Sequence, residues 1–179
     1  MTETSATAPR ILVFTGDGKG KTTAVMGMAL RAAGHGLRVR VLQFVKRPPG
    51  SGEAASLQAL PTVCISQCGR GFIPPPDSPR FAEHRQAACE GLAAVTEEIA
   101  AGSWDVVVLD ELCVAVAQGL VPEADVLALL EVLPAGIVLA MSGRGATPAL
   151  IAAADTVTEL KCIKHAMDAG RPAQRGVEM

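Results

Sequence analysis

Residues 16–23, Gly-Asp-Gly-Lys-Gly-Lys-Thr-Thr, gather three glycines, two lysines and two threonines in one short segment. Closely spaced glycines let the backbone turn tightly and point its N–H groups toward phosphate oxygens. Lys21 can reach the same phosphates as a positive charge, and the Thr22 hydroxyl can bind a magnesium ion. The segment therefore predicts a loop that binds a nucleoside triphosphate with Mg²⁺. The residues expected to hold the nucleotide are Gly16, Asp17, Gly18, Lys19, Gly20, Lys21, Thr22 and Thr23.

One position of this loop departs from the usual pattern. The motif G-x-x-x-x-G-K-[ST] requires a glycine at position 15, where this chain has Thr15, so the loop is effectively one residue shorter. A glycine-rich turn without a ligand is the structural alternative. The apolar strand predicted before the loop, the helix predicted after it and the Gly-Lys-Thr ending favour phosphate binding.

Two acids follow the most hydrophobic predicted strand. Val106 to Leu109 is apolar, and Asp110 and Glu111 come directly after it. Residues at the carboxyl ends of parallel strands gather at the edge of the sheet where ligands bind. A carboxylate there can hold Mg²⁺ directly or through water, so the predicted metal ligands are Thr22 and one of the two acids. The sequence does not choose between Asp110 and Glu111.

Three further side chains are candidates that also have a purely structural explanation. Arg144 and Lys46 each follow a predicted strand, and each either stabilises phosphate charge or is an ordinary surface residue. Phe72 heads a proline-rich loop and either contacts a substrate or anchors the loop to the core. His84 is expected to be exposed on a helix face.

The order of predicted elements gives the fold class. Apolar runs bounded by turn residues predict strands at 10–15, 38–45, 62–66, 106–109, 136–141 and 156–160. Helices are predicted at 22–33, 53–60, 78–101, 123–132 and 147–154, the third with Ser78 as N-cap and Pro79 at its first position. Alternating strands and helices predict an α/β fold with an open, mostly parallel sheet and helices on both faces. We expect a short flexible arm over residues 1–10 and a single domain over 11–179.

Composition excludes several other classes of protein. The chain has 179 residues, 49% of them hydrophobic, and a net charge of −2, which argues against general nucleic-acid binding. Its five cysteines form no CxxC pair, so neither a disulfide framework nor a zinc site is indicated. Without a signal peptide or an apolar run long enough to cross a bilayer, no membrane association is expected and the cytoplasm is the expected location.

Taken in order, these motifs closely resemble the ATP:corrinoid adenosyltransferases, the bacterial cob(I)alamin type with a phosphate loop. The resemblance covers nearly the whole chain after Arg10. Its most specific parts are the shortened loop and the Lys-His-x-x-Asp-Ala-Gly segment at 164–170. The segments that carry it are 14–23, 31–36, 43–46, 71–72, 108–112, 142–144, 154–159, 164–170 and 173–178.

The resemblance implies a RecA-like P-loop fold, a homodimer and transfer of the 5′-deoxyadenosyl group of ATP to Co(I) of a reduced corrinoid. The corrinoid would be cob(I)alamin or a cobinamide-type compound, and triphosphate would leave. In the family, the shortened loop is associated with ATP bound in reversed orientation. Thr22 and Glu111 would bind Mg²⁺, and Phe72 would face the corrin. The residues expected to serve catalysis are Lys21, Thr22, Phe72 and Arg144.

Two departures from the family and two competing functions accompany this expectation. Family members usually carry a Trp two residues after the loop Phe, where this chain has Pro74, and their aromatics help Co(II) to be reduced. With Pro74 in place of the Trp, another residue would have to assist the reduction of Co(II) to Co(I). A flavoprotein is the expected source of the electrons. Some members also use a longer N-terminal arm to cover the site. The competing functions are a non-catalytic ATP- or corrinoid-binding protein of the same fold and an ordinary P-loop NTPase.

Overall fold

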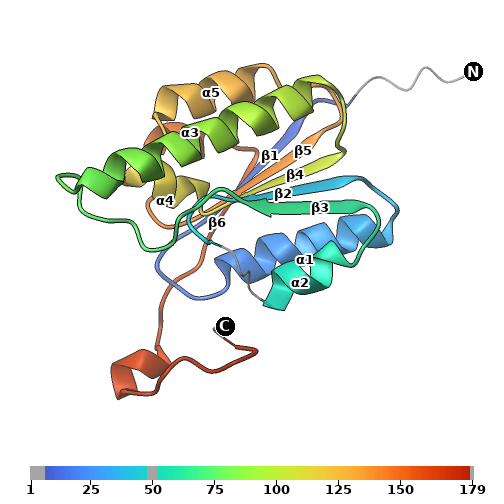
Figure 1. Ribbon diagram of the computed structural model, residues 1–179. Helices are drawn as coiled ribbons and strands as arrows, with labels where there is room; N and C mark the ends of the chain where they lie inside the picture. Colours follow the sequence, from blue (N-terminus) through green and yellow to red (C-terminus); the bar gives the residue numbers. More distant parts are fainter. Residues whose placement is uncertain (1–6, 48–51, 178–179) are drawn as a thin grey trace, which may run out of the picture.

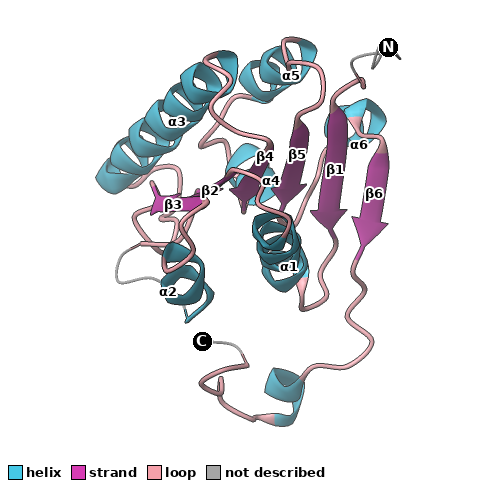
Figure 2. Ribbon diagram, turned by 90° about the vertical axis from the view of Figure 1, so that its right-hand side faces the viewer, coloured by secondary structure: helices cyan, strands magenta, loops and turns pink. Residues whose placement is uncertain are grey.

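The computed structural model describes residues 7–47 and 52–177. Within them, six strands form one sheet in the order β3-β2-β4-β5-β1-β6, and every neighbouring pair is parallel (Figure 2). The strands are β1 (Arg10–Thr15), β2 (Val39–Gln43), β3 (Val63–Gln67), β4 (Val106–Asp110), β5 (Val138–Ser142) and β6 (Thr156–Glu159). The predicted α/β fold with a parallel sheet is confirmed. Residues 1–6 of the predicted arm lie outside the described residues, and Arg10 already belongs to β1.

Helices cover both faces of the sheet (Figure 1). On one face lie α1 (Lys21–Gly34) and α2 (Gly52–Gln58). On the other lie α3 (Pro79–Ala100), α4 (Leu112–Ala117), α5 (Glu123–Glu131) and α6 (Pro148–Ala153). A 3₁₀ helix, η1 (Ala166–Ala169), interrupts the C-terminal segment. As predicted, Ser78 caps α3, its hydroxyl accepting from the Arg80 N–H at 3.3 Å.

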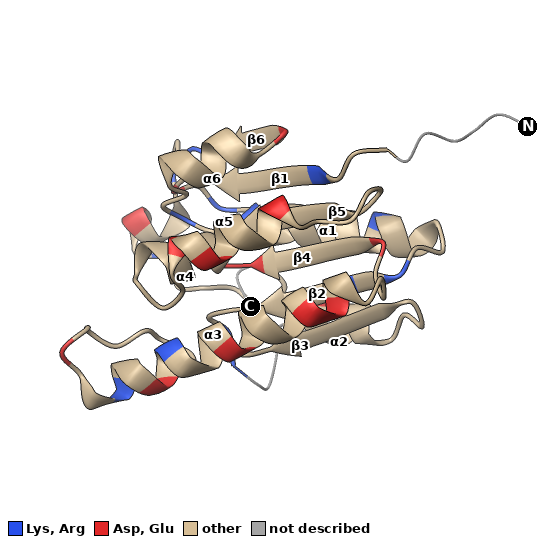
Figure 3. Ribbon diagram, turned by 90° about the horizontal axis from the view of Figure 1, so that it is seen from above, with Lys and Arg blue, Asp and Glu red and all other residues tan. Residues whose placement is uncertain are grey.

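The sheet separates two apolar clusters built mainly from small aliphatic side chains. On the α1 face, Val25 and Ala29 pack against Val41 of β2 and Val108 of β4. On the opposite face, Leu92, Val95 and Ile99 of α3 belong to the larger cluster. Both central strands β2 and β4 are buried along their whole length, as expected for strands covered on both faces. Basic and acidic residues are interspersed along α3 (Figure 3).

The strand order creates the crevice in which the predicted site lies. From β1 the chain passes through α1 and continues in β2, so β5 and β4 lie between these two consecutive strands. In open parallel sheets, ligands bind at such a switch point, beyond the carboxyl ends of the strands. The loop after β1 and the acids after β4 are thus separated by one strand, β5, which ends at Ser142.

The prediction that His84 is exposed is wrong. Its side chain is only 4% exposed on the inner face of α3, and its Nε2 has no hydrogen-bond partner among the described residues. Burial lowers the pKa of this imidazole, as do Arg80 and Arg70, whereas Glu83 opposes the shift. The helix is amphipathic only weakly, so periodicity alone did not show that this position faces inward.

We expect the lowered pKa of His84 to make folding stability depend on pH. Below the unfolded-state pKa of about 6.5, the unfolded chain binds the proton more readily than the folded one. The free energy of unfolding should therefore fall as the pH drops below this value, by at most about 1.4 kcal/mol per pH unit, until the folded-state pKa is passed. Urea unfolding between pH 8 and 5.5 measures this slope. His84→Gln should flatten it and His35→Gln, at an exposed turn, should not; equal slopes in both variants would contradict the assignment.

Candidate functional site

The predicted phosphate loop connects β1 to α1. Gly16 and Gly20 have φ angles of 93° and 113°, in the left-handed region that glycine adopts without strain. The Lys21 ammonium donates to the carbonyl oxygens of Gly16 and Gly18, at 2.7 Å in each case. Burial and the nearby Arg144 lower the pKa of Lys21, opposed by Glu111. The loop thus folds around its own lysine side chain.

The C-terminal segment packs directly against this loop. The Gly18 N–H donates to the Leu160 carbonyl oxygen at 2.7 Å, and Lys19 Nζ donates to the Val177 carbonyl oxygen at 2.5 Å. A Cβ on Gly18 would lie 2.7 Å from the Leu160 and Lys161 carbonyl oxygens, closer than real Cβ atoms come. Glycine is required at position 18 by this close approach of two backbones.

We expect Gly18→Ala to destabilise the protein by about 2 kcal/mol, because either the loop or the backbone after β6 must move. Gly27→Ala in α1 is the matched control, since a Cβ there would meet nothing within 4 Å. Replacing a glycine inside a helix by alanine should stabilise by about 0.5–1 kcal/mol. Chemical denaturation of both variants measures the difference, and equal stability of the two would contradict the packing argument.

Asp110, at the end of β4, is the centre of a buried polar cluster. Its Oδ1 accepts from the Thr22 hydroxyl at 3.0 Å and from the Ser142 hydroxyl at 2.7 Å. Its Oδ2 accepts from Gln43 Nε2 at 2.8 Å, and Lys46 Nζ lies 3.9 Å away. The residue is fully buried. Asp110 therefore holds other side chains in place and does not line the cavity next to it.

Glu111, the next residue, is only partly buried and lies in a different environment. Among the described residues it is the one non-glycine with a positive φ, 63°, a strained conformation that is common at functional sites. Its N–H donates to Ser142 Oγ at 3.1 Å. Burial and the charge of Asp110 raise the pKa of Glu111, whereas Lys21, Lys46 and Arg144 lower it. Glu111 lines the cavity and Asp110 does not, so Glu111 is the more accessible of the two acids.

The cavity in front of the phosphate loop has a volume of about 830 Å³, within the usual range for small-molecule sites. Loop residues, Lys46, Glu111 and Arg144 form its polar side. Met26 and Leu30 from α1, with Leu57 from α2 and Leu60 just after it, form a second wall. The predicted residues that line it are Asp17, Gly18, Lys19, Gly20, Lys21, Thr22, Thr23, Lys46, Glu111 and Arg144. Charge and an apolar wall side by side suit a ligand with a phosphate end and a flat organic end.

The remaining predicted residues lie at or outside this cavity. Arg144 is exposed over the loop, with Nη2 3.4 Å from the Asp17 carbonyl oxygen. Lys46 forms an ion pair with Glu53 at 3.2 Å. Phe72 does not line the cavity; its side chain is 94% exposed on the loop between β3 and α3. The structure thus brings together the residues predicted to bind the nucleotide and leaves Phe72 exposed outside the cavity.

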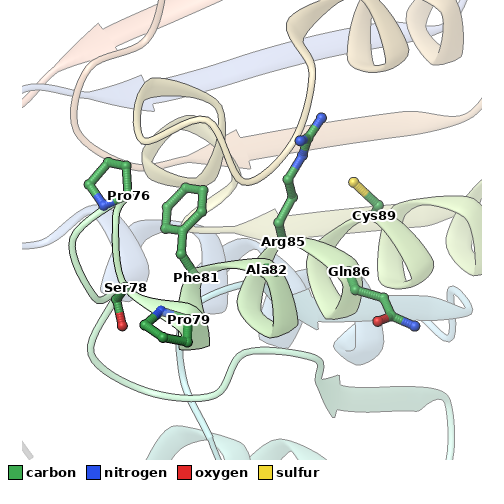
Figure 4. A pocket seen from close by; sticks show the side chains of 8 residues that line it. All are labelled: Pro76, Ser78, Pro79, Phe81, Ala82, Arg85, Gln86 and Cys89. Carbon is green, nitrogen blue, oxygen red and sulfur yellow. The ribbon is translucent and has the colours of Figure 1, made fainter.

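A second hollow, of about 470 Å³, lies between the proline-rich loop and the start of α3. Pro76 and Phe81 lie next to each other there (Figure 4), and Ser78 and Gln86 also line the hollow. None of the predicted site residues lines it.

Two residues that bond Asp110 beside the cavity, Gln43 and Ser142, were not among the predicted site residues. Both end a buried strand and are themselves fully buried. A polar residue that closes an apolar strand was the available signal, because a buried amide or hydroxyl needs a hydrogen-bond partner.

Two negative findings apply to the described residues. They contain no group of three or more His, Cys, Asp and Glu side chains that could hold a metal ion. None of their helices combines the length and the apolar character needed to cross a membrane.

A family model described as ATP:corrinoid adenosyltransferase BtuR/CobO/CobP matches residues 7–179. The chain belongs to this family. It is 41% identical over 170 residues to the corrinoid adenosyltransferase of Pseudomonas aeruginosa, covering 94% of this chain and 82% of that one. The corrinoid adenosyltransferase of Escherichia coli K12 is 40% identical over 169 residues, covering 94% and 84%. Corrinoid adenosyltransferase CobA of Salmonella typhimurium is 38% identical over 172 residues, with the same coverage.

Membership of the ATP:corrinoid adenosyltransferase family confirms the resemblance that the motifs indicated, and with it the expectation of an enzyme. The parallel sheet with a phosphate loop after β1 agrees with that family's P-loop fold. The family model extends through the C-terminal segment that packs on the loop. The matched region therefore contains every element that lines the cavity.

Proposed function

We propose that the protein transfers the 5′-deoxyadenosyl group of ATP to the Co(I) centre of a reduced corrinoid. A bond forms between cobalt and C5′, the bond between C5′ and the α-phosphate oxygen breaks, and triphosphate leaves with the electron pair. The observation that carries this proposal is the shortened phosphate loop facing a cavity with Glu111, in a chain of this family. Because the nucleophile is the cobalt itself, no protein base is required.

The chain's own residues have three tasks in this reaction. The loop amides, Lys21 and Arg144 bind the triphosphate and stabilise the negative charge that develops on it as it leaves. The apolar wall with Met26 and Leu30 holds the adenosine end away from water. Fixing both ends of ATP presents C5′ to the corrinoid, which lowers the entropic part of the barrier.

Thr22 and Glu111 fit a magnesium site at the cavity edge. The Thr22 hydroxyl donates its hydrogen to Asp110, so the lone pairs of its oxygen are available to a cation. Glu111 supplies the negative charge on the cavity side. When bound, Mg²⁺ would neutralise part of the triphosphate charge and so improve the leaving group.

We assign the corrinoid to the surface next to Phe72, on the loop between β3 and α3. An aromatic side chain that is 94% exposed suits contact with a large flat ligand. We also propose that the protein is a homodimer and that a flavoprotein supplies the electrons that form Co(I). A cytoplasmic location is proposed because the reaction consumes ATP.

Anaerobic incubation with ATP, Mg²⁺ and chemically reduced cobalamin tests the proposal. Adenosylcobalamin and triphosphate should appear in equal amounts, measured by absorbance and ion chromatography. ADP with phosphate would indicate an ordinary NTPase, and binding of both substrates without product would indicate a carrier. Starting from Co(II) cobalamin with a reduced flavin tests activation in a chain with Pro74, and cobinamide in parallel tests corrinoid preference.

A further inference from the structure

The loop that carries Phe72 is attached to the end of β2 at several points. The Cys68 N–H donates to the Gln43 carbonyl oxygen at 3.1 Å, and the Gly71 N–H donates to the Val45 carbonyl oxygen at 3.0 Å. A Cβ on Gly69 would lie 2.2 Å from the Val45 carbonyl carbon, so the two backbones touch at this point. The residue before Phe72 is thus fixed to the segment that directly follows Gln43 at the end of β2.

The Gln43 side chain continues this attachment into the polar cluster. Its Nε2 donates to Asp110 Oδ2 at 2.8 Å, and its Oε1 accepts from Gln67 Nε2 at 2.8 Å. Gln67 ends β3, immediately before the Phe72 loop. A chain of hydrogen bonds therefore runs from Gln67 through Gln43 to Asp110 and on to the Thr22 hydroxyl.

The direction of every bond in this chain is determined by Asp110. A carboxylate only accepts hydrogen bonds, so Gln43 must present its NH₂ group to Asp110 and its carbonyl oxygen to β3. That oxygen in turn requires a donor, which Gln67 supplies. The Gln43 side chain is fully buried, so water cannot replace either partner at low cost.

We propose that Gln43 is a positioning residue, and that Gln67 acts through it. Gln43 holds the Asp110 carboxylate in the orientation that accepts the Thr22 hydrogen, which keeps the Thr22 oxygen directed at the cation. Gln67 fixes the Gln43 amide from the side of the Phe72 loop. The nucleotide side and the loop side of the site are thereby held in one arrangement. This inference rests on the proposed function, but it concerns only how Mg²⁺ and ATP bind.

Titration calorimetry of the full chain with ATP at several Mg²⁺ concentrations tests this without any corrinoid. Gln43→Met, of similar length, should raise the Mg²⁺ concentration needed for half-maximal ATP binding about 10-fold or more, as for outer partners of metal ligands. Gln67→Met should raise it about 3-fold, the effect of one neutral hydrogen bond. The double variant should match Gln43→Met, because Gln67 acts through Gln43. Gln86→Met is the matched control, since Gln86 bonds another side chain on the exposed face of α3.

The calorimetry distinguishes a positioning role of Gln43 from a purely structural one. A purely structural role would lower the melting temperature and the fraction of active protein, but would leave the Mg²⁺ dependence of the remaining sites unchanged; that result, or additive losses in the double variant, would overturn the proposal. If Gln43→Met does not fold, Gln67→Met against Gln86→Met gives the same comparison. If the wild type binds MgATP but forms no adenosylcobalamin, the proposed function fails while this inference still stands or falls on binding.

Discussion

Lys21→Ala should reduce adenosyl transfer by about 1000-fold or more at saturating ATP. The Lys21 ammonium lies within the loop, bonded to the carbonyl oxygens of Gly16 and Gly18, and its pKa is lowered by burial and by Arg144. A preorganised charge facing the leaving group acts mainly on the transition state, where charge on the triphosphate is greatest. We therefore expect a loss in kcat as well as in kcat/KM, measured by the appearance of adenosylcobalamin.

Lys161→Ala is the matched control for this variant. Lys161 is a lysine close to the same loop, but its side chain is exposed and pairs with Glu159 at 3.7 Å. Exposed ion pairs contribute little to stability or binding, so turnover should stay within about 2-fold of the wild type. Comparable losses in both variants would point to general electrostatic attraction of ATP, and a near-normal rate for Lys21→Ala would remove Lys21 from the site.

Much of the fold was predictable because apolar runs and turn residues mark parallel strands directly. All six predicted strands are present, and the capping residues of α3 are those expected. The helix α4 was missed because Leu-Cys-Val-Ala-Val-Ala is a short apolar run, which periodicity cannot assign to helix or strand. The loop with Lys21 and Thr22 was predictable because its chemistry is local.

What the sequence left open depends on contacts between distant strands. Asp110 and Glu111 are adjacent acids, and only the positive φ at Glu111 and the partners of Asp110 give them different environments. Gln43 is 67 residues from the carboxylate it contacts. The close packing of Gly18 on Leu160 likewise joins the two ends of the chain. Local patterns name the residue types at the sheet edge, and strand order decides which of them meet.

Asp110→Asn should separate the orienting role of Asp110 from its structural one. The asparagine amide has the same size but only one accepting oxygen. With that oxygen toward Gln43, its NH₂ group faces Thr22 and Ser142, whose hydroxyls must rotate and accept. The Thr22 hydrogen then turns toward the cation position. We expect a stability loss of only about 1 kcal/mol, but at least a 10-fold weaker Mg²⁺-dependent binding of ATP and a comparable loss of turnover.

Asp110→Ala should lose both functions at once. Three donors, from Thr22, Ser142 and Gln43, lose their acceptor, and the NH₂ group of the buried Gln43 side chain is left without one. We expect about 3 kcal/mol of destabilisation together with near-complete loss of adenosyl transfer. Chemical denaturation and calorimetry on the two variants, with Asp125→Asn at an exposed position of α5 as the control, distinguish the effects. Asp110→Asn with wild-type MgATP binding would mean that the direction of the Thr22 hydrogen does not govern the metal site, and that Asp110 serves the fold alone.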